Sequence, residues 1–426
     1  MRVELLNTGT ELLMGFVVNT HAAWLGQKLS EPGLSIARQV CVNDDPREMK
    51  TCLKEAMRRA DLILVTGGLG PTGDDLTRNC VVEMLGLKTR VDARALKNIE
   101  ERFRRRGGAM PESVKCQAVV PEIATVFHNR NGTAPGLAIP CSRLNFAGKK
   151  NPRCRWMLLL PGPPRELRPM FEEQVLPLIR REFAGDLPVV DCRVFRVAGM
   201  GESSVEERVR PVLKNLNHLE IGYCARPGEV DVRLVARGKS KTDVRRLADE
   251  AEKRTRAALG TAIFGTGNRL LEEAVVNLLR GKNRRLATAE SCTGGYVAHR
   301  ITLVPGSADV FLQGWVTYSN QSKTQCLDVP PHLIRREGAV SESVAKRMAE
   351  GARKKAGADY ALSLTGIAGP SGGSAEKPAG TVFIALASKQ GVSVERFCFQ
   401  LDRETFKFIC AQTALNMLRT QLEKDD

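Results

Sequence analysis

Two adjacent carboxylates, Asp74 and Asp75, end a glycine-rich segment that reads Gly-Gly-Leu-Gly-Pro-Thr-Gly from residue 67. Glycine lets a loop turn its amide N–H groups toward an anion, and a following helix adds its positive dipole end. The carboxylate pair would repel a phosphate unless a divalent cation took oxygens from both groups. We therefore predict metal-assisted phosphate chemistry, with phosphate held by Gly67, Gly68, Gly70 and Thr72. A tight turn with an aspartate helix cap is the structural alternative.

The elements around this loop predict a layered α/β domain. Strands are expected over residues 2–6, 36–42, 62–65 and 156–160. Helices are expected from residue 12 to 29, over 46–59, after residue 76 and over 94–106. This alternation predicts a parallel sheet with helices on both faces, in which ligands gather beyond the carboxyl ends of the strands.

Acidic side chains follow three of these strands. Glu11 follows the first, Asp74 and Asp75 follow the third, and Glu166 follows the strand over 156–160. We predict that these four carboxylates converge on one oxygen-rich metal site. Thr10 offers a hydroxyl at the same edge, and the segment from Cys141 to Cys154 is expected to be an exposed basic loop.

Composition limits the class of protein. A chain of 426 residues is long enough for two or three domains, and no apolar run approaches the ~20 residues of a membrane span. With no signal-peptide pattern we expect a cytoplasmic protein. The net charge of +16 suits anionic nucleotides, whereas 5% aromatic residues argue against a specific nucleic-acid surface. Twelve scattered cysteines predict reduced, mostly buried thiols.

The N-terminal motifs resemble those of the CinA (competence/damage-inducible) family. The shared segments begin at residues 8 (Thr-Gly-Thr-Glu-Leu-Leu), 67, 132 (Gly-Thr-Ala-Pro-Gly) and 161 (Pro-Gly-Pro-Pro-Arg-Glu). The resemblance implies a fold similar to molybdopterin-binding proteins. It also implies hydrolysis of ADP-ribose to AMP and ribose 5-phosphate, dependent on a divalent metal such as Mg or Co and stimulated by potassium.

A serine in the C-terminal part lies where a strand passes into a glycine-flanked helix start. Ser291 occupies this place, and no histidine of the region lies in a comparable loop. Lys323, near Tyr318, could act as base, because a desolvated lysine loses its proton near neutral pH. The structural alternatives are a serine N-cap and a surface lysine.

The C-terminal motifs resemble the family's amidohydrolase domain, which converts nicotinamide mononucleotide to its nicotinate form and releases ammonia. The resemblance implies roles for Ser291, Tyr318 and Lys323, together with Gly294, Thr365, Gly366 and a phosphate-binding Arg403. One position departs from the family. Ala308 stands where the family carries its presumed serine nucleophile, so Ser307 or Ser291 must reach Lys323 for catalysis.

We therefore predict three domains, of which two are nucleotide-handling α/β domains joined by a small α+β module. Their expected bounds are 1–185 (molybdopterin-binding-like), 186–266 (small α+β) and 267–426 (deamidase-like). The expected protein is a homodimeric hydrolase of pyridine nucleotide recycling. Two rival functions are a nucleotide- or DNA-binding regulator without turnover and a role in molybdopterin handling, the latter by fold analogy alone.

Overall fold

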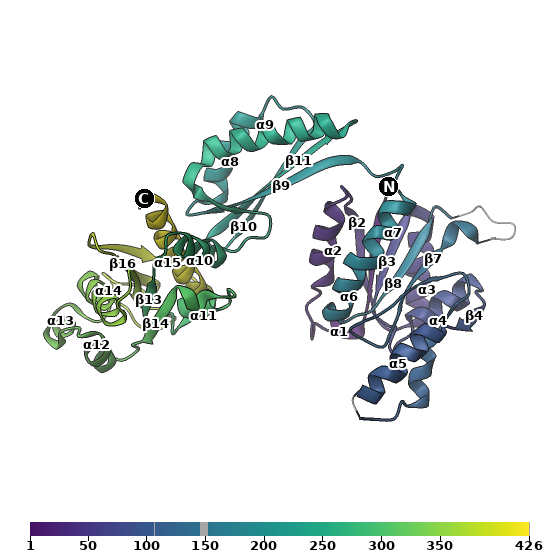
Figure 1. Cartoon of the computed structure of the whole chain (residues 1–426), viewed down its shortest axis with the longest axis horizontal. Coiled ribbons are helices and arrows are strands. Elements are labelled where there is room, and N and C mark those ends of the chain that lie inside the picture. The colour runs from purple at the N-terminus through teal and green to yellow at the C-terminus, as the bar shows by residue number, and fades with distance from the viewer. Residues whose placement is uncertain (106, 145–151, 426) are drawn as a thin grey trace. The chain divides into compact units, whose positions relative to one another are not determined.

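A computed structural model describes residues 1–105, 107–144 and 152–425. The centre of the predicted basic loop, and Arg106 of the predicted helix over 94–106, lie outside the described residues. The chain forms two compact units, Met1–Val190 with Arg237–Lys241, and Asp191–Ala236 with Thr242–Asp426 (Figure 1). No helix of the described part is long and apolar enough to cross a membrane.

The first unit contains a six-stranded sheet in the order β2-β1-β3-β8-β7-β6. Strands β1 (Val3–Thr8), β2 (Ile36–Val42), β3 (Leu62–Thr66) and β8 (Trp156–Leu160) pair in parallel. Strands β7 (Gly136–Pro140) and β6 (Thr125–Phe127) add antiparallel pairs, so the predicted parallel sheet is mixed. A separate ribbon pairs β4 (Thr89–Val91) with β5 (Val119–Pro121).

Helices cover both faces of this sheet because its central strands alternate their side chains. Ile63 and Val65 of β3 pack in a cluster with α3 (Pro46–Arg59) and α4 (Thr77–Leu85). Leu62 and Leu64 pack in a second cluster with α2 (His21–Ser30), α6 (Pro164–Met170) and α7 (Leu176–Glu182). Because successive side chains of a strand point to opposite faces of the sheet, the same strand contributes to two hydrophobic cores. The remaining elements are α1 (Thr10–Leu13), α5 (Ala93–Arg105), the π-helical turn η3 (Phe171–Val175) and the 3₁₀ turns η1 (Glu112–Ala118) and η2 (Cys141–Arg143).

The helix predicted from residue 12 to 29 is wrong, because α1 ends at Leu13 and α2 begins at His21. The intervening segment leaves Phe16 76% exposed and Val18 81% exposed, so no continuous apolar stripe faces the sheet.

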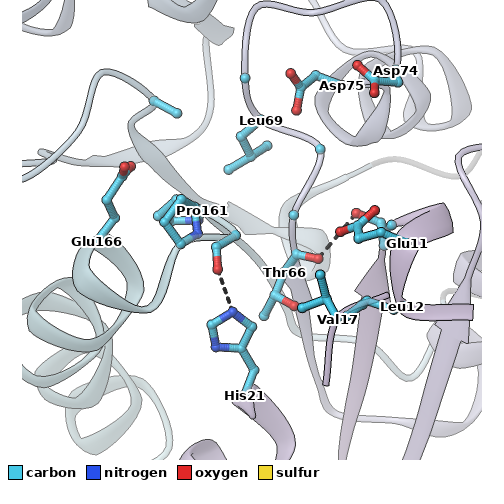
Figure 2. Close-up of a pocket in the computed structure, with 18 of the residues that line it drawn as sticks. Glu11, Leu12, Val17, His21, Thr66, Leu69, Asp74, Asp75, Pro161 and Glu166 are labelled. Carbon is cyan, nitrogen blue, oxygen red and sulfur yellow. Dashed lines mark hydrogen bonds between the residues drawn. The ribbon is translucent and has the colours of Figure 1, made fainter. Parts of the chain in front are cut away.

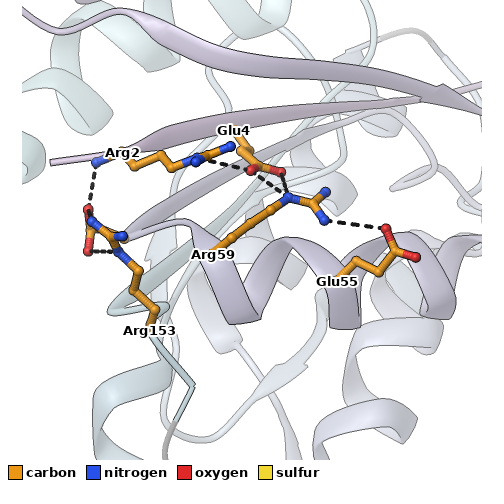
Figure 3. A network of polar contacts seen from close by, with 6 residues as sticks. Arg2, Glu4, Glu55, Arg59 and Arg153 are labelled. Carbon is orange, nitrogen blue, oxygen red and sulfur yellow. Dashed lines mark hydrogen bonds and ion pairs between the residues drawn. The ribbon is translucent and has the colours of Figure 1, made fainter.

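A polar network ties the amino edge of this sheet together (Figure 3). The Glu4 carboxylate, 4% exposed, lies 2.8 Å from Nε of Arg59 and 3.4 Å from Nε of Arg2. Asp61 accepts hydrogen bonds from the Arg2 amide and, at 2.9 and 3.0 Å, from Arg153. A buried carboxylate needs such partners, and Arg153 fixes the chain directly after the segment that is not described.

The predicted basic loop has buried ends. Cys141 and Cys154 are each 1% exposed, and a hydrogen bond with Cys141, together with burial, raises the pKa of Cys154. None of the twelve cysteines forms a disulfide bond, but only five are buried, so the prediction of mostly buried thiols is wrong.

The second unit begins with a four-stranded sheet in the order β10-β11-β9-β12. Its strands are β9 (Val189–Ala198), β10 (Leu219–Arg226), β11 (Glu229–Gly238) and β12 (Ile263–Thr266). Residues of α8 (Glu202–Leu213) and α9 (Lys241–Leu259) share a core with β9 and β11, and the turn η4 (Gly260–Ala262) leads into β12.

A five-stranded sheet follows, in the order β14-β13-β15-β16-β17. Strands β13 (Leu286–Glu290), β14 (Phe311–Val316) and β15 (Tyr360–Gly366) are parallel, whereas β16 (Thr381–Ala387) and β17 (Val392–Cys398) continue antiparallel. Helices α10 (Leu271–Gly281), α11 (Tyr296–Thr302) and α15 (Arg403–Lys424) share one core with the sheet. Helices α13 (Pro331–Glu337) and α14 (Glu342–Ala356) share the other, α12 (Asn320–Leu327) precedes them, and η5 (Ser307–Asp309) precedes β14.

Candidate functional site

The first unit holds a cavity of about 490 Å³ at the carboxyl edge of its parallel strands (Figure 2). Its lining includes Glu11 after β1, Asp44 after β2, the glycine loop after β3 and Glu166 after β8. Parallel strands end at one edge of a sheet, where ligands gather. The topology therefore brings the predicted strand-end loops together.

The glycine loop wraps closely around Asp75. The amide and the hydroxyl of Thr72 donate to Oδ2 of Asp75 at 3.0 and 2.5 Å. A Cβ on Gly70 would lie 2.2 Å from the same oxygen, so only glycine leaves room for it. The helix-cap alternative is not observed, because the residue that caps α4 is Leu76 and makes no side-chain cap bond.

The amides of the loop are not all available to a phosphate. The Gly67 amide donates to the Leu160 carbonyl at 3.0 Å, which removes Gly67 as a predicted donor. The amides of Gly68, Leu69 and Gly70 have no acceptor among the described residues. Three successive free N–H groups suit an anion such as phosphate.

The four predicted metal ligands line the same cavity but do not form one cluster. Figure 2 shows Glu11 and Glu166 on different sides, with Asp74 and Asp75 in a third place. Glu166 is held by the Asn129 amide at 2.8 Å, and a Cβ on Gly132 would lie 1.9 Å from its Oε2. Among the described residues, no three acidic, histidine or cysteine side chains are arranged to hold a metal ion.

The prediction of a single site with four carboxylates is therefore wrong. Loops that follow strands at the same edge of a sheet extend by different amounts and place their carboxylates in different parts of the cavity. The Asp74–Asp75 pair by itself fits a different kind of cation site, in which the protein supplies only part of the ligands. Mg²⁺ is commonly held by one or two carboxylates together with phosphate oxygens from the substrate.

Thr10 is also placed differently from the prediction. Its amide and hydroxyl both bond to Asp44 Oδ2, at 2.8 and 2.9 Å, and Thr10 does not line the cavity. Two ionisable residues of the lining were missed, Asp44 and His21. Nε2 of His21 lies 2.5 Å from the Gly162 carbonyl, and burial lowers the pKa of this imidazole. The strand-end argument that found Glu11 would also have found Asp44, which follows β2.

In the C-terminal domain, Ser291 and Lys323 lie in contact at the carboxyl edge of β13 and β14. Nζ of Lys323 lies 3.0 Å from Oγ of Ser291, although 32 residues separate them. Lys323 is 1% exposed and Ser291 is 8% exposed. The surface-lysine alternative is therefore wrong, and Ser291 is not a helix cap because α11 begins after Gly295.

Nζ of Lys323 is enclosed by oxygen atoms of the protein. Burial lowers the pKa of Lys323. Nζ also lies 2.7 Å from the Thr317 carbonyl and 3.3 Å from the Tyr318 carbonyl. When the amine is uncharged, its two protons can go to these carbonyls, which leaves the lone pair for the Ser291 hydroxyl. This is the arrangement of a serine with a lysine base.

Cationic side chains from the start of α15 border this pair. Arg403 donates to the Tyr318 hydroxyl at 3.0 Å and to the Gly369 carbonyl at 3.0 Å. Lys407, one turn further along α15, places Nζ 3.8 Å from where a Cβ of Gly294 would lie. Lys407 was not predicted, although its four-residue spacing from Arg403 is a helical signal.

Thr365 and Gly366 end β15 beside Ser291, but their side-chain positions are used for packing. The Thr365 hydroxyl donates to the Ala339 carbonyl at 2.8 Å. A Cβ on Gly366 would lie 2.7 Å from the Thr381 carbonyl oxygen. In the structure, the hydroxyl proton of Thr365 is used within the protein and Gly366 has no room for a side chain.

Ser307 and Ala308 lie at the opposite edge of the sheet from Lys323. They precede β14, which runs parallel to β13, whereas Ser291 follows β13 and Lys323 follows β14. Leu286 at the start of β13 pairs with Phe311, so residues 307 and 308 are near the amino ends of both strands. Within one chain the prediction that Ser307 could meet Lys323 is wrong.

Family models match three consecutive segments of the chain. Residues 4–181 match the "Probable molybdopterin binding domain", 192–265 the "Damage-inducible protein CinA KH domain" and 268–422 the "CinA C-terminal domain".

Related proteins match over nearly their full length. A CinA-like protein of Akkermansia muciniphila is 44% identical over 416 residues, covering 97% of this chain and 96% of the relative. A CinA-like protein of Dictyoglomus turgidum is 39% identical over 422 residues, covering 99% of each. Among solved structures, a competence/damage inducible protein of Agrobacterium tumefaciens is 37% identical, with a TM-score of 0.35, and covers 36% of this chain and 93% of its own.

Proposed function

The chain belongs to the CinA family, and on that premise we propose that its C-terminal domain hydrolyses the carboxamide of nicotinamide mononucleotide. The contact between buried Lys323 and Ser291 carries this proposal. A serine hydroxyl is a weak nucleophile until a base takes its proton, and an uncharged lysine is such a base.

The reaction follows from these two groups. Nζ of Lys323 takes the Ser291 proton while Oγ attacks the carboxamide carbon. The proton then passes to the departing nitrogen, which leaves as ammonia and gives an ester on Ser291. Lys323 next takes a proton from water, whose oxygen attacks the ester carbon. As the ester bond breaks, Lys323 returns that proton to Oγ of Ser291 and the nicotinate form is released. One water enters and one ammonia leaves, so atoms and charge balance.

Arg403 and Lys407 support a phosphorylated substrate. Both cations lie beside the Ser291 loop, and a mononucleotide carries a phosphate that such a pair attracts. Arg403 also fixes the Tyr318 hydroxyl at this side of the site.

Two matched serine variants test the assignment. Ser291 and Ser307 are both 8% exposed, but only Ser291 contacts Lys323. Ammonia release from nicotinamide mononucleotide should be lost in Ser291→Ala and kept in Ser307→Ala. The opposite result would reject Ser291 as nucleophile.

A second proposal concerns the cavity of the first unit. We propose that ADP-ribose binds there and that its pyrophosphate bond is hydrolysed, which gives AMP and ribose 5-phosphate. The free amides after Gly67 would hold one phosphate, and Asp74 with Asp75 would hold a divalent cation such as Mg or Co. When bound, that cation neutralises charge on the phosphates and lowers the pKa of water. Potassium remains an expectation.

Chelation separates the two proposals. AMP formation from ADP-ribose should stop in EDTA and return with added Mg or Co, whereas ammonia release by the same sample should persist. Loss of both activities would contradict the assignment of the metal to the first unit.

A further inference from the structure

The second unit contains another cavity, of about 380 Å³, between its four-stranded and five-stranded sheets. The middle domain contributes residues near the start of α8 and the turn from β10 to β11. The C-terminal domain contributes the end of β17 and one face of α15. None of the site residues predicted from sequence lines it. Its volume is in the range of small-molecule sites, about 300–1,000 Å³.

One wall of the cavity is aromatic. Phe397 and Phe399 lie with ring centroids 5.6 Å apart and planes within 10°, and both are only partly buried. Met200 and Ile409 extend the apolar lining. A flat ring placed against this wall would remove apolar surface from water and gain ring contacts.

The polar lining includes an acceptor without a partner. Gln412 is 1% exposed and its Nε2 donates to Glu229 at 2.5 Å, but its Oε1 has no partner among the described residues. A buried carbonyl without a donor costs about 1–3 kcal/mol, so turning this amide toward a ligand N–H group in the cavity would recover that cost. Glu202 and Glu229 also line the cavity. The cation of the described lining, Arg226, lies 2.9 Å from Asp231 and is neutralised by it.

We propose that this cavity binds a flat nitrogen heterocycle whose ring lies on Phe397 and Phe399 and whose N–H group reaches Gln412. Adenine and nicotinamide share this chemistry, since each joins an aromatic ring to an amino or carboxamide group. A phosphate would meet the carboxylate of Glu202, whereas the charge of Glu229 is neutralised by Arg196, so the site prefers an uncharged nucleoside or base to its 5′-phosphate. This site is separate from both proposed hydrolytic sites and does not depend on either activity.

Hydrogen exchange of the full-length protein tests the proposal by location. Adenosine or nicotinamide should slow exchange in residues 225–230 and 409–416, and whichever ring does so identifies the source of the ligand. Slowing by neither ring, or slowing only near Ser291 and the glycine loop, would overturn the proposal. Stronger protection of these segments by AMP than by adenosine would also overturn it, as would protection only by a single-stranded oligonucleotide.

Two phenylalanine variants provide a matched pair. Phe399→Leu removes a ring from the cavity wall, and we expect about 3- to 10-fold weaker binding of the protective ring. Phe408 of α15 is also partly buried but contacts Tyr296 and does not line the cavity. Phe408→Leu should therefore bind like wild type. Equal affinity in all three proteins would exclude the aromatic wall as a binding surface.

Discussion

Replacing Lys323 with methionine removes the buried amine and keeps a side chain of similar length. Lys323 is 1% exposed, and its Nζ is the basic group in contact with Ser291. General-base catalysis contributes about 10²- to 10⁴-fold, so we expect a loss of that size in the rate of ammonia release. The loss corresponds to about 3–5 kcal/mol of activation free energy.

The same variant should change how stability depends on pH. Burial lowers the pKa of Lys323 below its usual 10.5 in the folded protein. Between the folded pKa and 10.5, the unfolded chain therefore holds a proton that the folded chain lacks. The free energy of unfolding of wild type then rises with pH by up to about 1.4 kcal/mol per unit, and Lys323→Met lacks this dependence.

Lys323→Met should also lose stability by an amount that does not depend on pH. Methionine offers no donor to the Thr317 and Tyr318 carbonyls, which costs about 1–3 kcal/mol for each carbonyl left unpaired. That cost does not vary with pH. The buried amine is therefore identified by how the free energy of unfolding changes with pH, and not by the constant difference between the two proteins.

Calorimetric unfolding from pH 7 to 10, together with ammonia release, measures both effects. Lys355, which lies at the surface 3.0 Å from Asp328, provides the control variant Lys355→Met, with wild-type rate and slope expected. If Lys323→Met kept the wild-type rate, or the wild-type slope of stability against pH, the reasoning from its burial would be refuted.

Three other changes have defined outcomes. Ala308→Ser should not raise ammonia release, because residue 308 lies across the sheet from Lys323; a gain would mean that this segment reaches the site. Gly70→Ala should slow AMP formation from ADP-ribose at least tenfold and spare ammonia release, since its Cβ would displace Asp75, 2.2 Å away. Burial acts to raise the pKa of Asp61, but hydrogen bonds from Arg153 and the Arg2 amide lower it overall. Arg153→Met should therefore cost below about 1 kcal/mol at pH 7, and the cost should vanish as pH falls below 3.8, which thermal unfolding at both pH values would check.

Sequence patterns predicted the fold where local rules decide it. The apolar run before Gly67 and the helix from Pro46 to Arg59 were predicted because buried strands and amphipathic helices have distinct periods. The strand-end rule brought Glu11, Asp75 and Glu166 to one cavity. It could not give the distances between them, which depend on how far each loop extends.

The remaining features depend on contacts between distant segments. Strand β14 reads Phe-Leu-Gln-Gly-Trp-Val, which does not alternate apolar and polar residues, and it was not predicted. The end of the sheet at which Ser307 lies was therefore unknown. Lys323 is buried because its amine meets two carbonyls and a serine, although lysine is rarely buried in proteins. A hydroxyl donor such as Thr365 could be assigned to a ligand or to packing only from the three-dimensional contacts.

The position of α15 has a consequence for how the protein is made. Seven side chains of this last helix, from Phe406 to Leu422, are buried within the core of the C-terminal domain. A chain leaving the ribosome therefore exposes the apolar faces of α10 and the sheet until residue 422 has emerged, whereas the first unit can already fold. Gln412, which bonds to Glu229 of the middle domain, arrives equally late. During synthesis, aggregation risk should thus be concentrated in the second unit, and chaperones should be needed there most.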